Sequence, residues 1–437
     1  SLLMLVAVPA FAADKYFGPA TLLGGTMADC AHALIYTDAT NGASSSNIVA
    51  GDTVHFCDTI TGGTNFLFFT VANSGSSGSP ITFKWETGAI VQSSYFQPTG
   101  GIVCSGKSYI VIDGGTNGIL QNTANGQALA NQQASVGVQA TNCPNVIIRN
   151  LRVLTIYVKT QDVDDPDWAE AQSTEAIGVS QSDNALVTGN TTTDVAIGIG
   201  VGSAGSAMTG VEVSFNNLTN CNRCITATTD ATVTDYKIHD NDLGGGAQLW
   251  DQPDNAPFHL NAIHVFGAHV GTLANLQVYN NYIHGLWGQT TAHTTAYIFV
   301  EDTLASTPIY IFNNVFVQND DLESFPTGML VLRSVGNDAY VLNNTMLGSS
   351  VLGTGWGNNV LCPQDYGGTP NLFLKNNIFT YSAAFATNCI IGTGSNYNDY
   401  YLASDWGTYG TYAAYRTAGF DADVITSNPS LDGSYKP

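Results

Sequence analysis

The sequence predicts an all-β solenoid, in which short strands stack as successive coils along one axis. An asparagine recurs eight times in one local frame, a second series of short apolar runs lies between these asparagines, and no helical heptad or long amphipathic stretch competes with them. In such a repeat each unit buries its apolar face only against its neighbours. The core therefore grows along the axis, so the limit on the size of a single compact core does not apply to this chain of 437 residues.

Each recurring asparagine follows a short, mostly apolar run that we expect to be a strand. These residues are Asn150, Asn190, Asn217, Asn241, Asn281, Asn314, Asn344 and Asn377. The residue three positions earlier is apolar in seven cases, and Ser214 is the exception. A tight turn between strands needs a residue that tolerates the left-handed conformation, as asparagine does. Stacked coils would align the amides as a ladder, so we assign these asparagines a structural role.

The second series of runs indicates at least two short strands in each coil. Its members alternate inward and outward side chains: residues 177–179, 197–199, 225–227, 263–265, 298–300, 329–331 and 390–391. The gaps between successive asparagines range from 24 to 40 residues, so a constant frame carries insertions of variable length. Because loops on a rigid scaffold commonly carry function, we look for functional residues in the longest coils.

Charge and the first residues bear on location. The chain has 12 basic and 34 acidic residues, a net charge of −22. Such a surface repels nucleic acid and anionic membranes, and is compatible with a cation, with a neutral partner or simply with a soluble secreted protein.

Residues 2–8 are apolar and are followed by Ala10-Phe11-Ala12, which resembles a signal-peptide cleavage site. We therefore expect a secreted, extracellular or cell-surface protein without membrane insertion.

The predicted organisation has four parts. Residues 1–12 are read as a signal-peptide remnant, 13–100 as an N-terminal cap with the first coils, 101–395 as the repeat body, and 396–437 as a C-terminal segment that we expect to be incomplete. Eight cysteines in an exported chain predict disulfides. Proximity in the sequence suggests Cys30–Cys57, Cys104–Cys143 and Cys362–Cys389. Cys221 and Cys224 are separated by two residues, a spacing found in redox-active and zinc-binding pairs. Because no second pair of this kind lies near them in the sequence, a local disulfide is favoured.

Several segments resemble the right-handed parallel β-helix superfamily, the pectate-lyase-like fold. They are residues 51–54 (Gly-Asp-Thr-Val), 78–82 (Gly-Ser-Pro-Ile-Thr), 112–115 (Ile-Asp-Gly-Gly) and the recurring Asn-Asn-x-apolar frame. The resemblance implies a right-handed parallel β-helix solenoid with an N-terminal cap. It implies no mechanism, because this fold hosts lyases, hydrolases, esterases, tailspikes and adhesins, and no catalytic signature transfers residue by residue.

The first candidate site is acidic. Five carboxylates lie within nine residues of one of the two longest coils: Asp162, Asp164, Asp165, Asp167 and Glu170. Calcium requires six to eight oxygens on a flexible loop, so this segment is a candidate calcium site, with a solvated acidic loop as the alternative. Trp168 beside it is a candidate for stacking on a sugar.

The second candidate site lies in and after the coil from residue 241 to 281. If Ile263 and Val265 point inward, His264 points outward, and the same alternation turns Tyr297 and Glu301 outward in the next coil. Arg333 ends the equivalent strand one coil further. With strands roughly 4.8 Å apart, these polar residues would form an outward file of an imidazole, a carboxylate and a guanidinium, a plausible acid–base set. The predicted catalytic residues are His264, Glu301, Arg333 and His259, and the predicted substrate-binding residues are Trp250, Trp287, Tyr297 and Trp168.

Each member of the file also has an ordinary structural interpretation, since histidines on strands are commonly satisfied polar residues and Glu–Arg pairs are commonly cross-strand ion pairs. Two classes of function follow. The first is a secreted polysaccharide lyase or glycoside hydrolase that acts in a groove on the outer face of the coils. The second is a non-catalytic surface protein, such as an adhesin, a tailspike-like spike or a filament-forming subunit. Polysaccharide is the expected partner, and an oligomer or filament is compatible with regular stacking.

Overall fold

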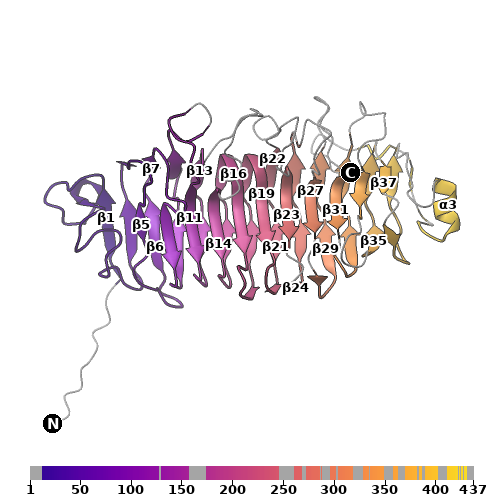
Figure 1. Ribbon diagram of the computed structural model, residues 1–437, viewed down its shortest axis with the longest axis horizontal. Coiled ribbons are helices and arrows are strands. Elements are labelled where there is room, and N and C mark those ends of the chain that lie inside the picture. The colour runs from indigo at the N-terminus through magenta and orange to yellow at the C-terminus, as the bar shows by residue number, and fades with distance from the viewer. Residues whose placement is uncertain are drawn as a thin grey trace, which may run out of the picture.

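The computed structural model describes residues 12–126, 129–156, 174–245, 260–267, 272–285, 287, 296–301, 304–317, 328–333, 335–348, 358–362, 370–380, 383–385, 389–401, 411–421, 423, 425–426 and 428–430. Within them the chain is a parallel β-helix, as predicted. Its strands pair in parallel register with strands one coil before and after, and the coils stack into an elongated body with β1 at one end and α3 at the other (Figure 1).

Each coil contributes strands to three faces in a fixed order. The A face is one continuous sheet. Its strands are β2 (Leu34–Ile35), β1 (Asp14–Gly18), β3 (Thr53–Phe56), β6 (Ile81–Trp85), β9 (Ile110–Asp113), β12 (Ile147–Arg149), β15 (Leu186–Thr188), β18 (Glu212–Ser214), β21 (Lys237–His239), β25 (Gln277–Tyr279), β29 (Ile309–Phe312), β32 (Ala339–Leu342), β35 (Asn371–Lys375) and β38 (Ile390–Ile391).

The B face follows the A face across the turn that carries the asparagines. Its strands are β4 (Thr59–Thr61), β7 (Ile90–Ser93), β10 (Ile119–Asn122), β13 (Arg152–Leu154), β22 (Asp242–Gly245), β26 (Tyr282–His284), β30 (Val315–Val317), β33 (Thr345–Leu347), β36 (Ile378–Thr380) and β39 (Asp399–Tyr401). The C face comes next. Its strands are β5 (Phe69–Thr70), β8 (Ile102–Ser105), β11 (Val136–Thr141), β14 (Glu175–Ser180), β23 (Asn261–Phe266), β27 (Ala296–Glu301), β31 (Gly328–Arg333), β34 (Asn358–Leu361) and β37 (Ala383–Phe385).

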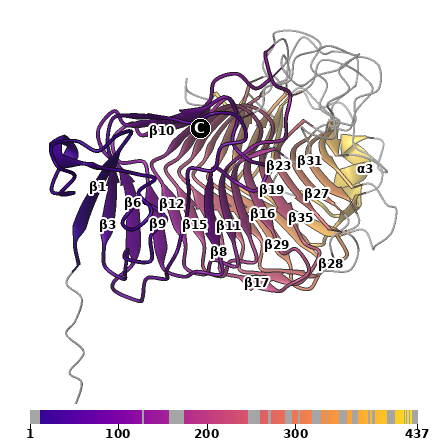
Figure 2. The same cartoon turned by 60° about the vertical axis from the view of Figure 1, so that its left-hand side comes forward.

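Two strands run through the corner between the B and C faces. They are β16 (Thr191–Gly202) and β19 (Asn217–Thr228), and they join the two faces into one hydrogen-bonded sheet. Short strands between the C and A faces form a small fourth sheet of β17 (Met208–Thr209), β20 (Val233–Thr234), β24 (Thr272–Ala274) and β28 (Leu304–Ala305). The turned view shows β19, β23, β27 and β31 side by side (Figure 2).

The inward side chains form one continuous core along the axis. On the C face the register aligns a file of isoleucines that have no solvent exposure, namely Ile177, Ile199, Ile225, Ile263 and Ile298. Each fully buried isoleucine contributes roughly 1.5–3 kcal/mol to stability. The predicted alternation of the second strand series is confirmed at these positions.

The asparagine ladder is present, but two predicted members are wrong by one residue. Each turn uses two consecutive residues: the first has a positive φ, and the second inserts its side chain between coils. Asn150, with φ 57°, is an exposed residue of the first kind, and Asn217 is exposed just beyond the turn. Asn216 takes the ladder position instead, which places Val213 three residues earlier and removes the Ser214 exception. The ladder is Asn190, Asn216, Asn241, Asn281, Asn314, Asn344, Asn377 and Asn398, and its amides hydrogen-bond one to the next.

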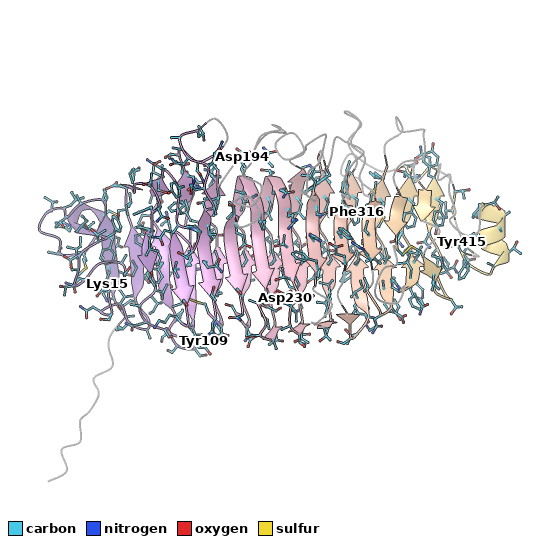
Figure 3. The ribbon with its side chains drawn as sticks, viewed as in Figure 1. Lys15, Tyr109, Asp194, Asp230, Phe316 and Tyr415 are labelled. Carbon is cyan, nitrogen blue, oxygen red and sulfur yellow. A yellow bond between two sulfur atoms is a disulfide. The ribbon has the colours of Figure 1, made fainter. Side chains whose placement is uncertain are left out.

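The ladder ends at a buried carboxylate. The Nδ2 atom of Asn398 donates to Asp421, and the hydroxyls of Tyr400 and Tyr415 donate to the same carboxylate at 2.9 Å. Tyr415 belongs to α3 (Tyr412–Thr417), whose N-cap Thr411 accepts a hydrogen bond from the amide of Ala414. Asp421 thus continues the ladder by one step, and α3 covers the last coil. Figure 3 labels Tyr415 at this end of the molecule and Lys15 at the other.

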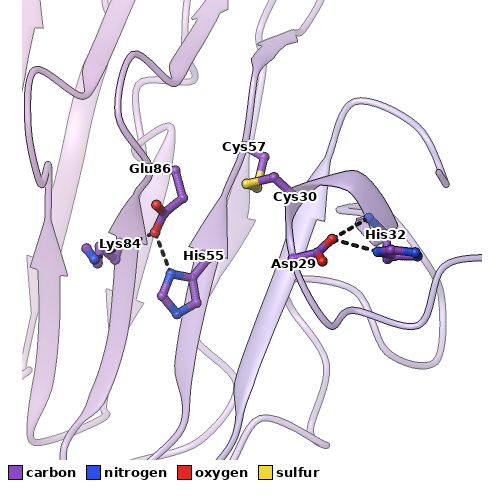
Figure 4. Close-up of a disulfide and its surroundings, with 7 residues drawn as sticks. All are labelled: Asp29, Cys30, His32, His55, Cys57, Lys84 and Glu86. Carbon is purple, nitrogen blue, oxygen red and sulfur yellow. Dashed lines mark hydrogen bonds and ion pairs between the residues drawn. A yellow bond between two sulfur atoms is a disulfide. The ribbon is translucent and has the colours of Figure 1, made fainter. Parts of the chain in front are cut away.

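All four disulfides join the predicted pairs: Cys30–Cys57, Cys104–Cys143, Cys221–Cys224 and Cys362–Cys389. The first connects the short helix η1 (Cys30–His32) to the end of β3 (Figure 4). None of the helices among the described residues has the length and apolar character needed to cross a membrane. The predicted signal-peptide remnant lies almost wholly outside the described residues.

Candidate functional site

The predicted outward file of polar residues is present on the C face. The Nε2 atom of His264 on β23 lies 2.8 Å from Oε1 of Glu301 on β27. Arg333, at the end of β31, donates from Nη1 to the other carboxylate oxygen at 3.0 Å. The three residues therefore form a continuous chain across neighbouring coils.

Aromatic rings fix the position of the imidazole. His264 stacks on Phe299 with ring centroids 5.2 Å apart and lies 4.5 Å from the ring of Phe266. It is only 3% exposed, although it points away from the core. An ionised Glu301 accepts a hydrogen bond from Nε2, so in the neutral ring Nδ1 is the basic nitrogen. Arg333 in turn stabilises the carboxylate charge, which gives an oriented base of the kind used in acid–base catalysis.

Arg223 is a second cation on this face, and the alternation of residues in the sequence does not predict it there. It lies on β19, directly beside Asn261 of β23, and its guanidinium is 5.9 Å from the ring centroid of Phe266. The side chain is 9% exposed, and this burial lowers its pKa to about 10 although Glu301 acts in the opposite direction. Arg223 therefore remains charged at neutral pH.

Arg223 and Asn261 present buried donors that the described residues do not satisfy. Neither Nε of Arg223 nor Nδ2 of Asn261 has a hydrogen-bond partner among these residues. The carbonyl oxygen of the Asn261 side chain is occupied, since it accepts from the amide of Ala296 at 2.9 Å. These two donors come from adjacent strands, whose backbones are about 4.8 Å apart, and such a pair suits an acceptor with two oxygens such as a carboxylate.

The Cys221–Cys224 disulfide explains how Arg223 reaches the outer face. Both sulfur-bearing side chains are fully buried in the core, and the bridge spans only Asn222 and Arg223. Just before it, Asn220 takes a left-handed conformation with φ 52° and turns the strand around the corner. The local chain is therefore held from inside at both ends, and Arg223 projects outward.

Glu175 is a further titratable group on this face that the alternation did not reveal. Its carboxylate lies over two glycines of the C face: a Cβ atom built on Gly178 or Gly200 would come within 2.5 Å of a Glu175 oxygen. Burial raises the pKa of Glu175 to about 7. The glycines thus leave the space that this carboxyl group occupies.

The face between Glu175 and His264 is lined by small side chains. The outward positions of β14, β16 and β19 are Gly178, Ser180, Gly200, Gly202, Thr226 and Thr228. Further along, the corresponding positions hold His264, Phe266, Phe299, Glu301 and Arg333. We call the stretch of small residues the trough. It runs along the axis and ends at the His264 cluster.

The connections between the B and C faces change length at the trough. In β16 and β19 the corner is a single left-handed residue, Asp194 or Asn220, and Nδ2 of Asn220 donates to Asp194 at 3.0 Å. Figure 3 labels Asp194 at this edge. By contrast, 20 residues separate β13 from β14 and 15 separate β22 from β23. The two coils of β16 and β19 therefore have no insertion at this corner, whereas β14, at one end of the trough, follows a long connection and β23 beyond its other end follows another.

Two predicted substrate-binding residues do not line this face. Tyr297 and Trp287 are each 1% exposed and pack in the core, where the Tyr297 hydroxyl donates to the carbonyl of Val317 and Trp287 donates to that of His284. The prediction for Tyr297 was wrong because the strand bends there, so that both Tyr297 and Ile298 point inward. The remaining predicted residues lie outside the described residues: His259, Trp250, Trp168, Asp162, Asp164, Asp165, Asp167 and Glu170.

Comparison with models of protein families and with curated protein sequences gave no match. Among solved structures, a mannuronic acid specific family 6 polysaccharide lyase from human gut microbiota is similar at 11% identity and a TM-score of 0.39, over 95% of this chain and 92% of the other. A rhamnogalacturonan lyase shows 13% identity and 0.36, over 98% and 89%. The pectate lyase Pel9A shows 11% and 0.33, over 78% of each chain.

At these values the similarities assign no activity or substrate to this chain. The parallel strand topology by itself establishes the fold, a parallel β-helix, in agreement with the resemblance seen in the sequence.

Proposed function

We propose that the protein is a secreted polysaccharide lyase that cleaves an acidic glycan by β-elimination on the C face. The observation that carries this proposal is the pair of buried donors without partners among the described residues, Arg223 Nε and Asn261 Nδ2, beside a histidine oriented by Glu301. A buried cation next to an oriented base is what removal of a proton α to a carboxylate requires. The four disulfides are compatible with an oxidising, extracellular location.

In the proposed reaction the uronate carboxylate binds to Arg223 and Asn261, which stabilise the negative charge that builds up on it. The Nδ1 atom of His264 accepts the proton from the carbon next to the carboxylate. The electron pair of that C–H bond forms a carbon–carbon double bond, and the glycosidic C–O bond on the next carbon breaks. The departing oxygen leaves with the bonding electrons and takes a proton from water.

The described carboxylates favour elimination over hydrolysis. A glycoside hydrolase normally places two carboxyl groups about 5–9.5 Å apart on either side of the bond to be cleaved. Asp194, at the corner of β16, accepts a hydrogen bond from Asn220. The other carboxylates on the described C-face strands are Glu175 and Glu301, which lie on β14 and β27, four strand steps apart. At roughly 4.8 Å per step their backbones are about 19 Å apart, which is too far for such a pair.

The decisive experiment measures turnover of a panel of acidic and neutral polysaccharides. Elimination gives an unsaturated uronate that absorbs ultraviolet light, whereas hydrolysis gives reducing ends without this absorbance. We expect the absorbance to rise with acidic glycans only. His264→Ala should lower kcat by a factor of about 10²–10⁴, the usual contribution of a general base.

Arg223→Ala should lower kcat/KM to a similar extent, and Arg149→Ala is its matched control. Arg149 is paired with Asp113 at 2.8 Å on the A face, so its loss should leave turnover unchanged. Reducing ends without unsaturated products would instead identify a hydrolase. No turnover of any acidic glycan, together with glycan binding or ordered polymers, would identify a non-catalytic surface protein.

Calcium remains a prediction, because the acidic segment from Asp162 to Glu170 lies outside the described residues. The described residues themselves contain no cluster of three or more potential metal ligands. Loss of turnover in EDTA, with recovery on addition of calcium, would support a metal site in that segment.

A further inference from the structure

The carboxylate of Glu175 lies against two glycines of the trough, and the described residues place no cation beside it. Its Oε1 atom would be 2.5 Å from a Cβ built on Gly200, and its Oε2 atom 2.4 Å from one on Gly178. On the adjacent strand β11, the carbonyl oxygen of the Gln139 side chain approaches the same Gly178 position to 2.5 Å. The glycine position is therefore flanked by the Glu175 carboxylate and by a second acceptor oxygen.

The surrounding elements supply no compensating charge among the described residues. The strand before Glu175 presents Val136 and Gln139, and the strand after it presents Ile197 and Gly200. Within the described part of this face, Arg223 is the first cation toward His264, two strand steps further, a distance of roughly 10 Å. Burial raises the pKa of Glu175 to about 7, and no charged neighbour among the described residues contributes to this shift.

We propose that Glu175 is a specificity-determining residue that restricts its end of the trough to an uncharged sugar unit, while Arg223 binds an acidic unit. This inference rests on the function proposed above. The backbones of the two residues are about 10 Å apart, roughly the length of two sugar units. The preferred substrate is therefore a polymer with a neutral unit two units away from the acidic unit that Arg223 binds, and a homopolymer of uronates is disfavoured.

The physical basis is a repulsion that only one class of substrate meets. An ionised Glu175 repels a uronate carboxylate bound above the glycines, whereas a protonated Glu175 can donate a hydrogen bond to a sugar hydroxyl. A neutral sugar at that position avoids the repulsion in either state. Discrimination against the homopolymer should therefore increase as the pH rises through the pKa of Glu175.

The test measures dissociation constants in a His264→Ala background, which prevents turnover and removes the imidazole titration. Oligosaccharides of a homopolymeric uronate and of the same uronate chain with a neutral sugar two units away from one uronate are compared at about pH 5.5 and about pH 8.5, on either side of the Glu175 titration. We expect the homopolymer to bind about tenfold more weakly at the higher pH, relative to the oligosaccharide with the neutral unit. Adding Glu175→Gln should remove this difference, and the control Glu212→Gln, on the A face, should preserve it.

A second variant tests the geometry. Gly200→Ala places a methyl group where the Glu175 carboxyl lies, so it should displace that group toward water and move the pH transition to a lower value. The outcomes separate the two proposals. If acidic glycans bind but Glu175→Gln leaves the pH dependence of homopolymer binding unchanged, the specificity role is wrong. If no acidic glycan binds at either pH, the proposed function itself is wrong.

Discussion

Replacement of Asn314 by alanine tests the ladder that holds the coils together. The Nδ2 atom of Asn314 donates to the carbonyl of Val278 at 2.9 Å and to Oδ1 of Asn344 at 3.0 Å. Its Oδ1 atom accepts from the backbone and side-chain nitrogens of Asn281, both at 3.0 Å. Four hydrogen bonds at about 1 kcal/mol each, plus a buried N–H of Asn281 left without an acceptor, give a loss of roughly 4–6 kcal/mol.

The neighbouring residue provides the matched control. Asn313 is exposed and has φ 56°, so Asn313→Ala costs only the strain of a left-handed alanine, about 1 kcal/mol. Urea unfolding followed by circular dichroism measures the two losses. Hydrogen exchange of peptides from β25, β29 and β32 then shows whether the damage is local, as nearest-neighbour coupling in a solenoid requires. Equal losses for the two variants would refute the hydrogen-bond energies assigned to the ladder.

Two further predictions concern the C face. The Cys221→Ser/Cys224→Ser variant should have a kcat/KM on acidic glycans about tenfold lower, because Arg223 loses the disulfide that positions it. The Cys30→Ser/Cys57→Ser variant is the control for general loss of stability. Equal effects of the two variants on kcat/KM would contradict the positioning role of the Cys221–Cys224 disulfide. The raised pKa of Glu175 makes the native state bind more protons than the unfolded state between pH 4.5 and 7, so the stability contributed by Glu175 falls as the pH rises through this window. Glu175→Gln removes this loss and should therefore stabilise the fold increasingly over the same range. Unfolding free energies at several pH values measure this gain, for which about 3 kcal/mol is an upper limit; a pH-independent difference would contradict it.

Much of the fold was accessible from the sequence because the same physical constraint repeats in every coil. Inward positions such as Ile199 and Ile225 stay apolar, so period-two alternation marks the strands. The ladder register was harder, since the turn needs two adjacent polar residues with different roles. Where the chain reads Asn216-Asn217 or Asn150-Leu151, the identity of one asparagine does not reveal which role it has. Only the apolar residue three positions before the ladder, Val213, distinguishes the two frames in the first case.

The site was predicted where the strand alternates regularly, and missed where it bends. His264 and Glu301 lie after the bend, so simple parity placed them outward, and the structure joins them to Arg333. Glu175 and Arg223 lie before it. Each lies two residues before an inward isoleucine of its own strand, so strict alternation would turn its side chain inward. Both side chains nevertheless lie on the outer face. Tyr297 directly precedes the inward Ile298, so strict alternation predicted it outward, and the bend turns it inward.

The bend also explains why functional groups can gather at this corner. In several C-face strands two consecutive residues point into the core, for example Ala176-Ile177, Cys224-Ile225 and Tyr297-Ile298. The residue before each pair must then turn outward at the edge of the face. From that edge a long side chain extends over the strand: Glu175 reaches the glycines, and Arg223 reaches the ring of Phe266. A charged residue at this position gains nothing for the core, and the buried Nε atom of Arg223, which has no partner among the described residues, is consistent with the proposed binding of a ligand there.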